Sequence, residues 1–251
     1  GKKLAEKLRR ENPDLLVALG AEAAILSRRE LRSFPLVFGL IEDDWQSHDL
    51  RSGKQATGVA CHPSPEQVLE RLKKVAPLVR RIAVLHDPAR GAERLRRLEP
   101  VFAALKMTML PGEVPAGDKL AQALARLREQ VDAWWLLPDP VLVRQEAFSQ
   151  LLEEQLQGSR PLIAPSGELV HAGALLAVEA DRRAIGIQLA DLARRILFGG
   201  LSPAELEVQE PERVVWHLNK AAAARIGLEI AKPLLAEVDR LHDQLPPPSR
   251  K

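Results

Sequence analysis

The sequence lacks several features that would point to particular classes of protein. It contains no tyrosine and a single cysteine, Cys61, in 251 residues. One thiol excludes both an internal disulfide and a metal cluster built on cysteines. No apolar run approaches the roughly 20 residues of a membrane-spanning helix, and no charged and then apolar signal peptide opens the chain. These absences predict that the chain as given is soluble and globular.

The distribution of charge argues against a nucleic-acid partner. The 36 basic and 34 acidic side chains nearly cancel, and they are interleaved rather than gathered on one basic stretch. The sequence has no glycine-rich phosphate loop, no HExxH motif and no GxSxG motif. Paired acids could in principle hydrolyse a glycoside, but a carboxylate at almost every strand end is more typical of a recognition surface. We therefore expect a binding protein with no cofactor and no metal, and not an enzyme.

Helical and strand patterns alternate along the chain. Residues 64–76 begin with the capping residue Ser64 and carry one apolar stripe, and two more amphipathic helices are predicted at 118–131 and 182–200. Continuous apolar runs of strand length lie between the helices, at residues 15–20, 35–41, 81–86, 133–138, 161–165 and 174–179, with a weaker one at 106–110. Continuous runs are typical of strands that helices cover on both faces. The pattern predicts an α/β fold with doubly wound parallel sheets.

Polar side chains follow almost every predicted strand. In open parallel sheets, ligands bind beyond the carboxyl ends of the strands, because loops and helix N-termini converge there. The predicted ligand-binding residues at these ends are Ala21, Glu22, Asp43, Asp44, Trp45, His86, Asp87, Asp139, Ser166, Glu168, Glu179 and Asp181. A structural role is the alternative for each position: Asp87, Asp139 and Ser166 could cap turns or helices, and His86 could be a loop histidine with protein partners.

The order of several segments resembles that of a known family. The segments are "KKLAEKLRRENPDLLVALGAEAA", "FPLVFGLIEDD", "ATGV", "PSPEQVLERLKKVAPLVRRIAVLHDPA", "VDAWWLLPDPVL", "PLIAPSGELVHAGALLAVEADRRAIGIQLADLARRIL" and "VVWHLNKAAAARIGLEI". Together they resemble the ABC-transporter solute-binding proteins that include the tryptophan and phenylalanine binders. The similarity covers nearly the whole chain.

This resemblance implies a type I periplasmic-binding fold. Such a fold has two doubly wound lobes, a small-molecule ligand in the cleft between them, and a closure that presents the bound form to a membrane permease. It also implies a periplasmic or lipid-anchored location. We expect a first lobe at 1–79 with a return segment at 182–200, and a second lobe at 80–181 with residues 201–245 attached. The proline-rich tail at 246–251 is expected to be disordered.

The sequence departs from the family at two places. Family members usually begin with a strand, helix and strand that have no counterpart here, so either the chain is truncated or the unit is naturally absent. If it is naturally absent, the first lobe has an uncovered sheet edge that can pair with another copy. The positions that read the ligand also differ. After the glycine of "ALG", where a small hydroxyl residue is usual, this chain has Ala21 and then Glu22, and Arg182 and Arg183 stand where tyrosines are usual. Without tyrosine, an aromatic cage would depend on Trp45.

Two hypotheses follow. In the first, the chain is the solute-binding component of an ABC-type uptake system. The acidic strand ends then favour a small ligand with an amine, such as an amino acid, read by Asp139, Asp87 and Asp181, with Glu22 next. In the second, the chain is a degenerate scaffold or sensor module that has kept the fold and lost or altered its pocket. It would then be a homodimer, with Arg182 and Arg183 on the surface or paired with the acids of the site.

Overall fold

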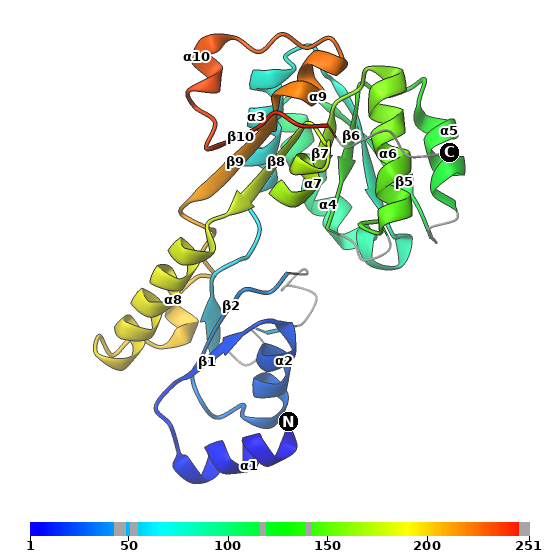
Figure 1. The fold of residues 1–251 in the computed structure, drawn as a ribbon. Coiled ribbons are helices and arrows are strands. Elements are labelled where there is room, and N and C mark those ends of the chain that lie inside the picture. The colour runs from blue at the N-terminus through cyan, green and yellow to red at the C-terminus, as the bar shows by residue number, and fades with distance from the viewer. Residues whose placement is uncertain (43–48, 51–54, 116–118, 139–141, 246–251) are drawn as a thin grey trace. The chain divides into compact units, whose positions relative to one another are not determined.

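The computed structural model describes residues 1–42, 49–50, 55–115, 119–138 and 142–245 (Figure 1). The chain divides into two compact units. Unit 1 comprises Gly1–Pro63 and Ala180–Val214, and unit 2 comprises Ser64–Glu179 and Val215–Lys251. Each unit has its own sheet. No helix in the part of the chain that the structure describes has the length and apolar character needed to cross a membrane.

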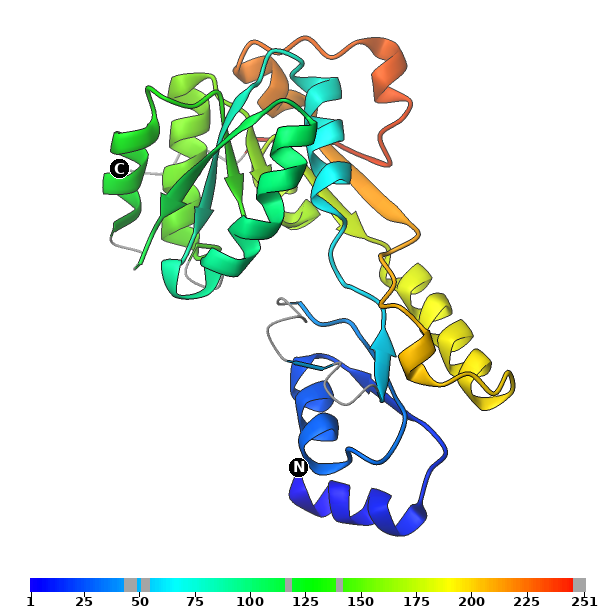
Figure 2. The ribbon, with the colours of Figure 1, turned by 180° about the vertical axis from the view of Figure 1, so that it is seen from behind.

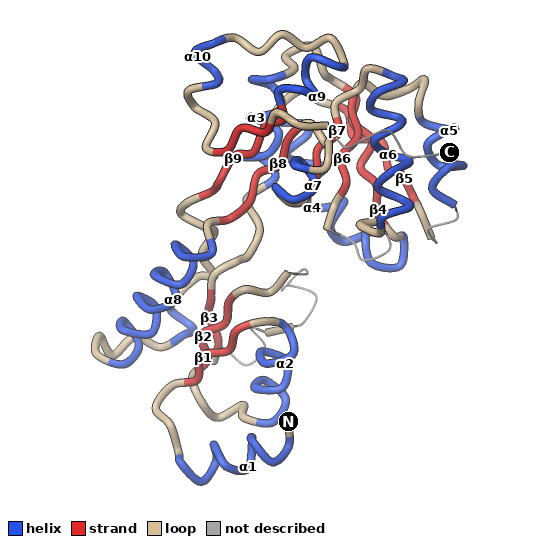
Figure 3. The backbone as a smooth tube through the Cα atoms, in the orientation of Figure 1, coloured by secondary structure: helices blue, strands red, loops and turns tan. Residues whose placement is uncertain are grey.

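Unit 1 is built on a parallel sheet with the strand order β1-β2-β3 (Figure 3). Its elements are α1 (Lys2–Glu11), β1 (Leu16–Leu19), α2 (Ala21–Glu30), β2 (Leu36–Gly39), β3 (Ala56–Gly58), α8 (Arg182–Leu197) and the 3-10 turn η4 (Pro203–Glu205). Helices α1 and α2 pack on one face against Leu16, Ala18 and Phe38. Helix α8 covers Val37 on the other face. The sheet is therefore enclosed by helices on both sides at β2.

Unit 2 contains a larger sheet with the strand order β10-β9-β8-β7-β6-β4-β5. Its strands are β4 (Arg81–His86), β5 (Thr108–Glu113), β6 (Ala133–Leu136), β7 (Leu162–Ala164), β8 (Leu176–Ala180), β9 (Val214–Asn219) and β10 (Arg240–His242). Its helices are α3 (Pro65–Val75), α4 (Pro88–Ala104), α5 (Leu120–Leu127), α6 (Gln145–Gly158), α7 (Gly167–His171), α9 (Lys220–Arg225) and α10 (Lys232–Leu235). These elements form one α/β body.

Helices cover both faces of the larger sheet. Trp134 and Leu136 point toward α5, α6 and α7 and share one buried cluster with them. Trp135, the residue between them in β6, points to the opposite face and stacks on Phe102 of α4 with ring centroids 6.2 Å apart. Figure 2 shows α3 and α4 on that face. Because both faces are buried, the strands read as continuous apolar runs, and the predicted α/β class is confirmed.

One pair of neighbouring strands breaks the parallel pattern. The backbone N–H of Asn219 donates to the carbonyl of Leu175, and that of Asp181 donates to the carbonyl of Arg213. Residue numbers therefore rise along β8 as they fall along β9, so these two strands are antiparallel. The consequence is that β9 brings a histidine, His217, beside the end of β8.

The observed division of the chain differs from the expected boundary between residues 79 and 80. Helix α3 belongs to unit 2, and residues 201–214 belong to unit 1 with α8. Ser64 caps α3 as predicted: its hydroxyl accepts from the N–H of Gln67, and the Gln67 side chain accepts from the N–H of Ser64. The apolar stripe of α3 shows that the helix is amphipathic, but not which sheet it covers. The expected tail at 246–251 lies outside the described residues.

Candidate ligand-binding site

The strand ends of unit 2 hold the most informative of the predicted residues, His86. It is the last residue of β4, and its side chain is only 3% exposed. Neither of its ring nitrogens has a hydrogen-bond partner among the described residues. Burying a polar group without a partner costs about 1–3 kcal/mol. The structure therefore leaves this imidazole with an unmet demand for hydrogen bonds.

Helix α4 shapes the space around this ring. A Cβ atom on Gly91, in the first turn of α4, would lie 2.1 Å from Nδ1 of His86. The glycine therefore leaves room for the imidazole beneath the helix. Farther along α4, the guanidinium of Arg94 donates to the carbonyl of Pro138, which follows β6 (3.3 Å). The ends of β4 and β6 are thus linked through one helix.

Two of the predicted residues in unit 2 cap helices. The carboxylate of Asp87 accepts from the N–H of Ala89 at the start of α4 (2.9 Å). The hydroxyl of Ser166 accepts from the N–H of Leu169 at the start of α7 (3.5 Å). The capping alternative therefore describes both. Each still lies at the carboxyl end of a strand, and the cap fixes its side chain in place.

Two glutamates keep their charge available. Glu168 in the first turn of α7 and Glu22 in the first turn of α2 are exposed, and neither has an ion pair or hydrogen bond with the residues described. Helix α2 begins at Ala21 and has Gly20 as its N-cap, with φ 87° and no capping side chain. Its first N–H groups therefore receive no side-chain acceptor, and such a helix terminus favours a carboxylate.

The remaining described acids have protein partners. Asp181 caps α8 through bonds from the N–H groups of Arg183 and Ala184 (2.9 and 3.2 Å), and it lies 3.4 Å from Arg213. Glu179 pairs with Nε2 of His217 at 3.0 Å. These contacts neutralise part of the acidic character that the sequence suggested for the strand ends.

An arginine of unit 1 also pairs with an acid. Arg182 lies 2.9 Å from Glu42, as the second hypothesis expects of an arginine at that position. Four predicted residues, Asp43, Asp44, Trp45 and Asp139, lie outside the described part of the chain. Their place in the site stays a prediction.

Sequence reasoning missed a group of histidines in unit 2. His217 of β9, His242 of β10 and His171 of α7 lie with neighbouring ring centroids 5.4 and 5.7 Å apart. These residues are 71 positions apart in sequence at most, and two of them belong to strands with no clear sequence signal. Among the described residues, no group of three or more histidine, cysteine, aspartate or glutamate side chains is arranged to hold a metal ion.

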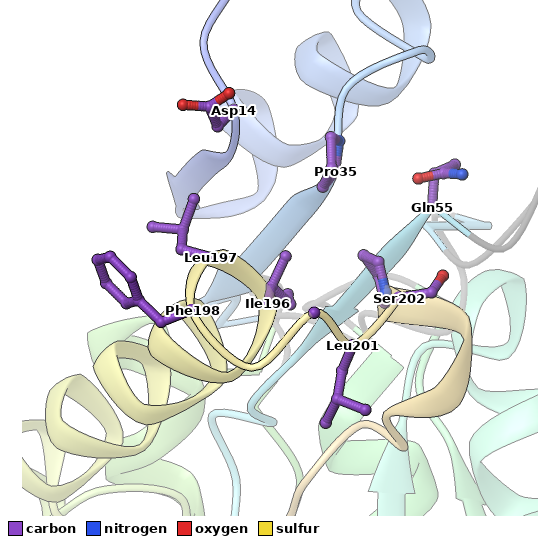
Figure 4. Close-up of a pocket in the computed structure, with 10 residues that line it drawn as sticks. Asp14, Pro35, Gln55, Ile196, Leu197, Phe198, Leu201 and Ser202 are labelled. Atoms are coloured by element: carbon purple, nitrogen blue, oxygen red, sulfur yellow. The ribbon is translucent and has the colours of Figure 1, made fainter.

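A cavity in unit 1 lies at the other end of its sheet. It has a volume of about 740 Å³ and includes Asp14, Pro35 and Gln55, which precede β1, β2 and β3, together with residues 196–198 and 200–203 (Figure 4). None of the predicted ligand-binding residues lines it. Ligands of parallel sheets bind at carboxyl ends, so this cavity is not the candidate site.

A family model decides the identity of the chain. The model described as ABC transporter substrate binding protein matches residues 2–241. The chain belongs to this family. Its members are binding proteins and not enzymes, as the sequence predicted. No curated protein matches the chain.

Several solved structures share the fold. A Streptococcus pneumoniae ABC domain in complex with L-Trp is 21% identical, with a TM-score of 0.69 over 95% of this chain and 82% of that one. A conserved domain protein from Vibrio cholerae is 25% identical, with a TM-score of 0.67 and the same coverage. A ligand-free, open substrate-binding protein with adhesive properties from Clostridium difficile is 16% identical, with a TM-score of 0.78 over 97% of this chain and 82% of that one.

Proposed function

We propose that this substrate-binding protein serves an ABC-type uptake system and binds a small, amine-containing, amino acid-like solute at the carboxyl ends of its strands. His86 is the observation that carries the proposal. A buried imidazole without a partner lowers stability unless a ligand completes its hydrogen bonding. The family membership supports a solute as that ligand and a membrane permease as the partner. A periplasmic or lipid-anchored location is part of the same proposal.

Each unit, taken by itself, offers polar groups suited to one end of an amino acid. In unit 2, the exposed carboxylate of Glu168 is an acceptor for an ammonium group. In unit 1, the uncapped start of α2 offers N–H donors for a carboxylate. Glu22 would repel that carboxylate. We therefore propose that the protein selects its ligand by the positive charge of the amine. An amino acid is also the ligand named for the S. pneumoniae protein, with which this chain shares the fold.

A thermal-shift screen over amino acids, polyamines and small amides tests the proposal. At a ligand concentration 100 times Kd, the free energy of unfolding should rise by about 2.7 kcal/mol. We expect at least one amine-containing compound to give such a shift, and expect Glu168→Gln to weaken it, because the substitution removes one negative charge at nearly constant size. A screen in which none of the amines stabilises the protein would overturn the proposal.

A second candidate function is a scaffold that binds a second copy of the chain through β1. On its free edge, β1 has no strand partner among the described residues, and Val17 and Leu19 are each 55% exposed. The strand has no charged residue or proline, the usual devices that protect an edge. A partner on this edge must supply a strand with unpaired backbone groups and apolar side chains that cover Val17 and Leu19. The same edge of a second copy supplies both. The Arg182–Glu42 pair favours this candidate because it neutralises charge at the predicted site.

Sedimentation velocity of the full chain tests the scaffold candidate. We expect a dimer that Val17→Lys converts to a monomer, because the lysine would place a charge in the interface between the β1 strands of the two copies. Leu78→Lys is the control, since Leu78 is 88% exposed in unit 2 and lies outside β1. A wild-type chain that sediments as a monomer at every concentration would contradict the candidate.

A further inference from the structure

A chain of hydrogen bonds joins a carboxylate and two imidazoles in unit 2. Oε2 of Glu179 lies 3.0 Å from Nε2 of His217, whose side chain is 14% exposed. The other ring nitrogen of His217, Nδ1, lies 3.1 Å from Nε2 of His242. The two rings are 21° from parallel and their centroids are 5.4 Å apart. That separation places the facing nitrogens nearly in line between the ring centres, which is the geometry of a hydrogen bond and not of two ligands that share a metal.

The number of protons on this pair decides whether the bond exists. Only one hydrogen fits between the two facing nitrogens. When both rings are neutral, Nε2 of His242 carries it and donates to His217. When one extra proton is bound, His217 is charged, pairs with Glu179 and donates to His242. A second extra proton puts a hydrogen on both facing nitrogens, and the bond is replaced by repulsion between two like charges.

The other charged groups around the pair oppose the second proton. His171 of α7 packs against His242, with ring centroids 5.7 Å apart and an angle of 63°. Burial, together with His217 and His171, lowers the pKa of His242, and Asp243 acts in the opposite direction. Asp243 also pairs with Lys220 of α9 at 3.0 Å, which offsets its negative charge.

The pair is in contact with the turn that carries two predicted ligand-binding residues. A Cβ atom on Gly167 would lie 2.2 Å from Cε1 of His217, so the imidazole rests on the backbone at the start of α7. Ser166 and Glu168 flank this glycine. A change in the position of the His217 ring therefore moves the backbone that presents them.

We propose that Glu179, His217 and His242 form a proton switch that couples acidification to the first turn of α7 and thereby weakens solute binding. The link to solute binding rests on the proposed function, whereas the switch itself does not. When the second proton binds, the imidazoles separate, and β10 loses a side-chain bond to β9. That strand is short and lies at the sheet edge, where it pairs with β9 through three residues. The loss falls on the least supported strand of the sheet.

The sign of the pH dependence follows from His242. Its pKa is lower in the folded than in the unfolded chain, where the ordinary value is about 6.5. The unfolded chain therefore binds more protons in the interval below that value, and the stability of unit 2 falls as the pH decreases through it. Above that interval, the contribution of the pair is fully present.

Nuclear magnetic resonance of the full chain without added ligand tests the switch, with protons as the only probe. The chain has six histidines, so single substitutions can assign the Cε1–H resonances. We expect the Cε1–H resonance of His242 to change with pH below its ordinary range, and the resonances of His217 and of the Gly167 amide to shift over the same pH range. A His217 or Gly167 resonance that does not follow that of His242 would overturn the proposal.

Two variants separate the switch from other effects of pH. His242→Gln retains a side chain able to bond His217 but takes up no proton, so its urea midpoint should fall between pH 7.5 and 5.5 by less than half as much as that of the wild type. His62→Gln removes a histidine of unit 1 that lies outside the group of His171, His217 and His242. Its urea midpoint should fall over this pH interval by as much as that of the wild type. If the urea midpoint of His242→Gln falls by as much as that of the wild type, the switch is refuted. If this variant does not fold, the resonances of the wild type decide. Failure of solute binding alone, with the pH-dependent shifts of His217, His242 and Gly167 present, would count against the proposed function and not against the switch.

Discussion

Replacing His86 with leucine is expected to stabilise the protein and to abolish most of its solute binding. The buried imidazole has no partner for either nitrogen among the described residues, so an apolar side chain of similar volume removes an unmet demand for hydrogen bonds. We expect the free energy of unfolding to rise by about 1–2 kcal/mol. The same change removes the group that is proposed to bind the ligand, and the Kd should rise at least about tenfold. Urea unfolding and a binding titration with the best compound of the screen measure the two effects.

Gln155→Leu is the matched control for this prediction. Gln155 is a fully buried polar residue in the same unit, but its amide donates to the carbonyl of Gly173 (2.8 Å) and accepts from the N–H of Leu162 (3.1 Å). Its replacement should lower the stability by about 2–3 kcal/mol, because two buried backbone groups lose their partners. Opposite signs at the two positions would show that the imidazole is retained for binding. A His86→Leu variant as unstable as Gln155→Leu would contradict the proposal.

The sequence was sufficient for the elements that are buried on both faces. The apolar runs at 81–86 and 133–138 became β4 and β6 with small changes at their ends, and the helices at 64–76 and 182–200 became α3 and α8. β9 and β10 were not predicted. β9 has partly exposed positions that interrupt its apolar pattern, and β10 consists of exposed residues and one half-buried histidine. Strands of this kind are specified by their neighbours in the sheet and not by their own composition.

The sequence did not reveal which acids of the candidate site have protein partners. A carboxylate at the end of a strand looks the same in sequence whether it meets a ligand or caps a helix. Asp87 and Asp181 both cap helices, and of these two only Asp87 was named as a possible cap from the sequence. Glu179 meets its partner His217 only because β9 returns antiparallel beside β8. The burial of His86 likewise depends on the small size of Gly91 in the following helix, a pairing that no local pattern reveals.

The other large effect is expected from Asn219→Ala, at the end of β9. This fully buried side chain donates to the carbonyls of Val170 and Gln244 (2.8 and 3.0 Å) and accepts from the N–H of Ala222 (2.9 Å). It therefore joins the end of α7, the segment after β10 and the start of α9. Alanine leaves all three backbone groups without this partner, and we expect a loss of about 3 kcal/mol in the free energy of unfolding. Tryptophan fluorescence in urea measures the loss, since three of the four tryptophans belong to unit 2.

Two further variants show which bonds of Asn219 matter. Serine is also a favourable helix cap, so Asn219→Ser should recover about 1 kcal/mol by accepting again from Ala222. Lys220→Ala changes the adjacent residue, whose ion pair with Asp243 is largely exposed, and should alter the stability by less than about 0.5 kcal/mol. If Asn219→Ala lost no more than Lys220→Ala, the three segments would have to be held by apolar packing alone. A loss near 3 kcal/mol would instead show that one amide fixes the framework around the histidine group.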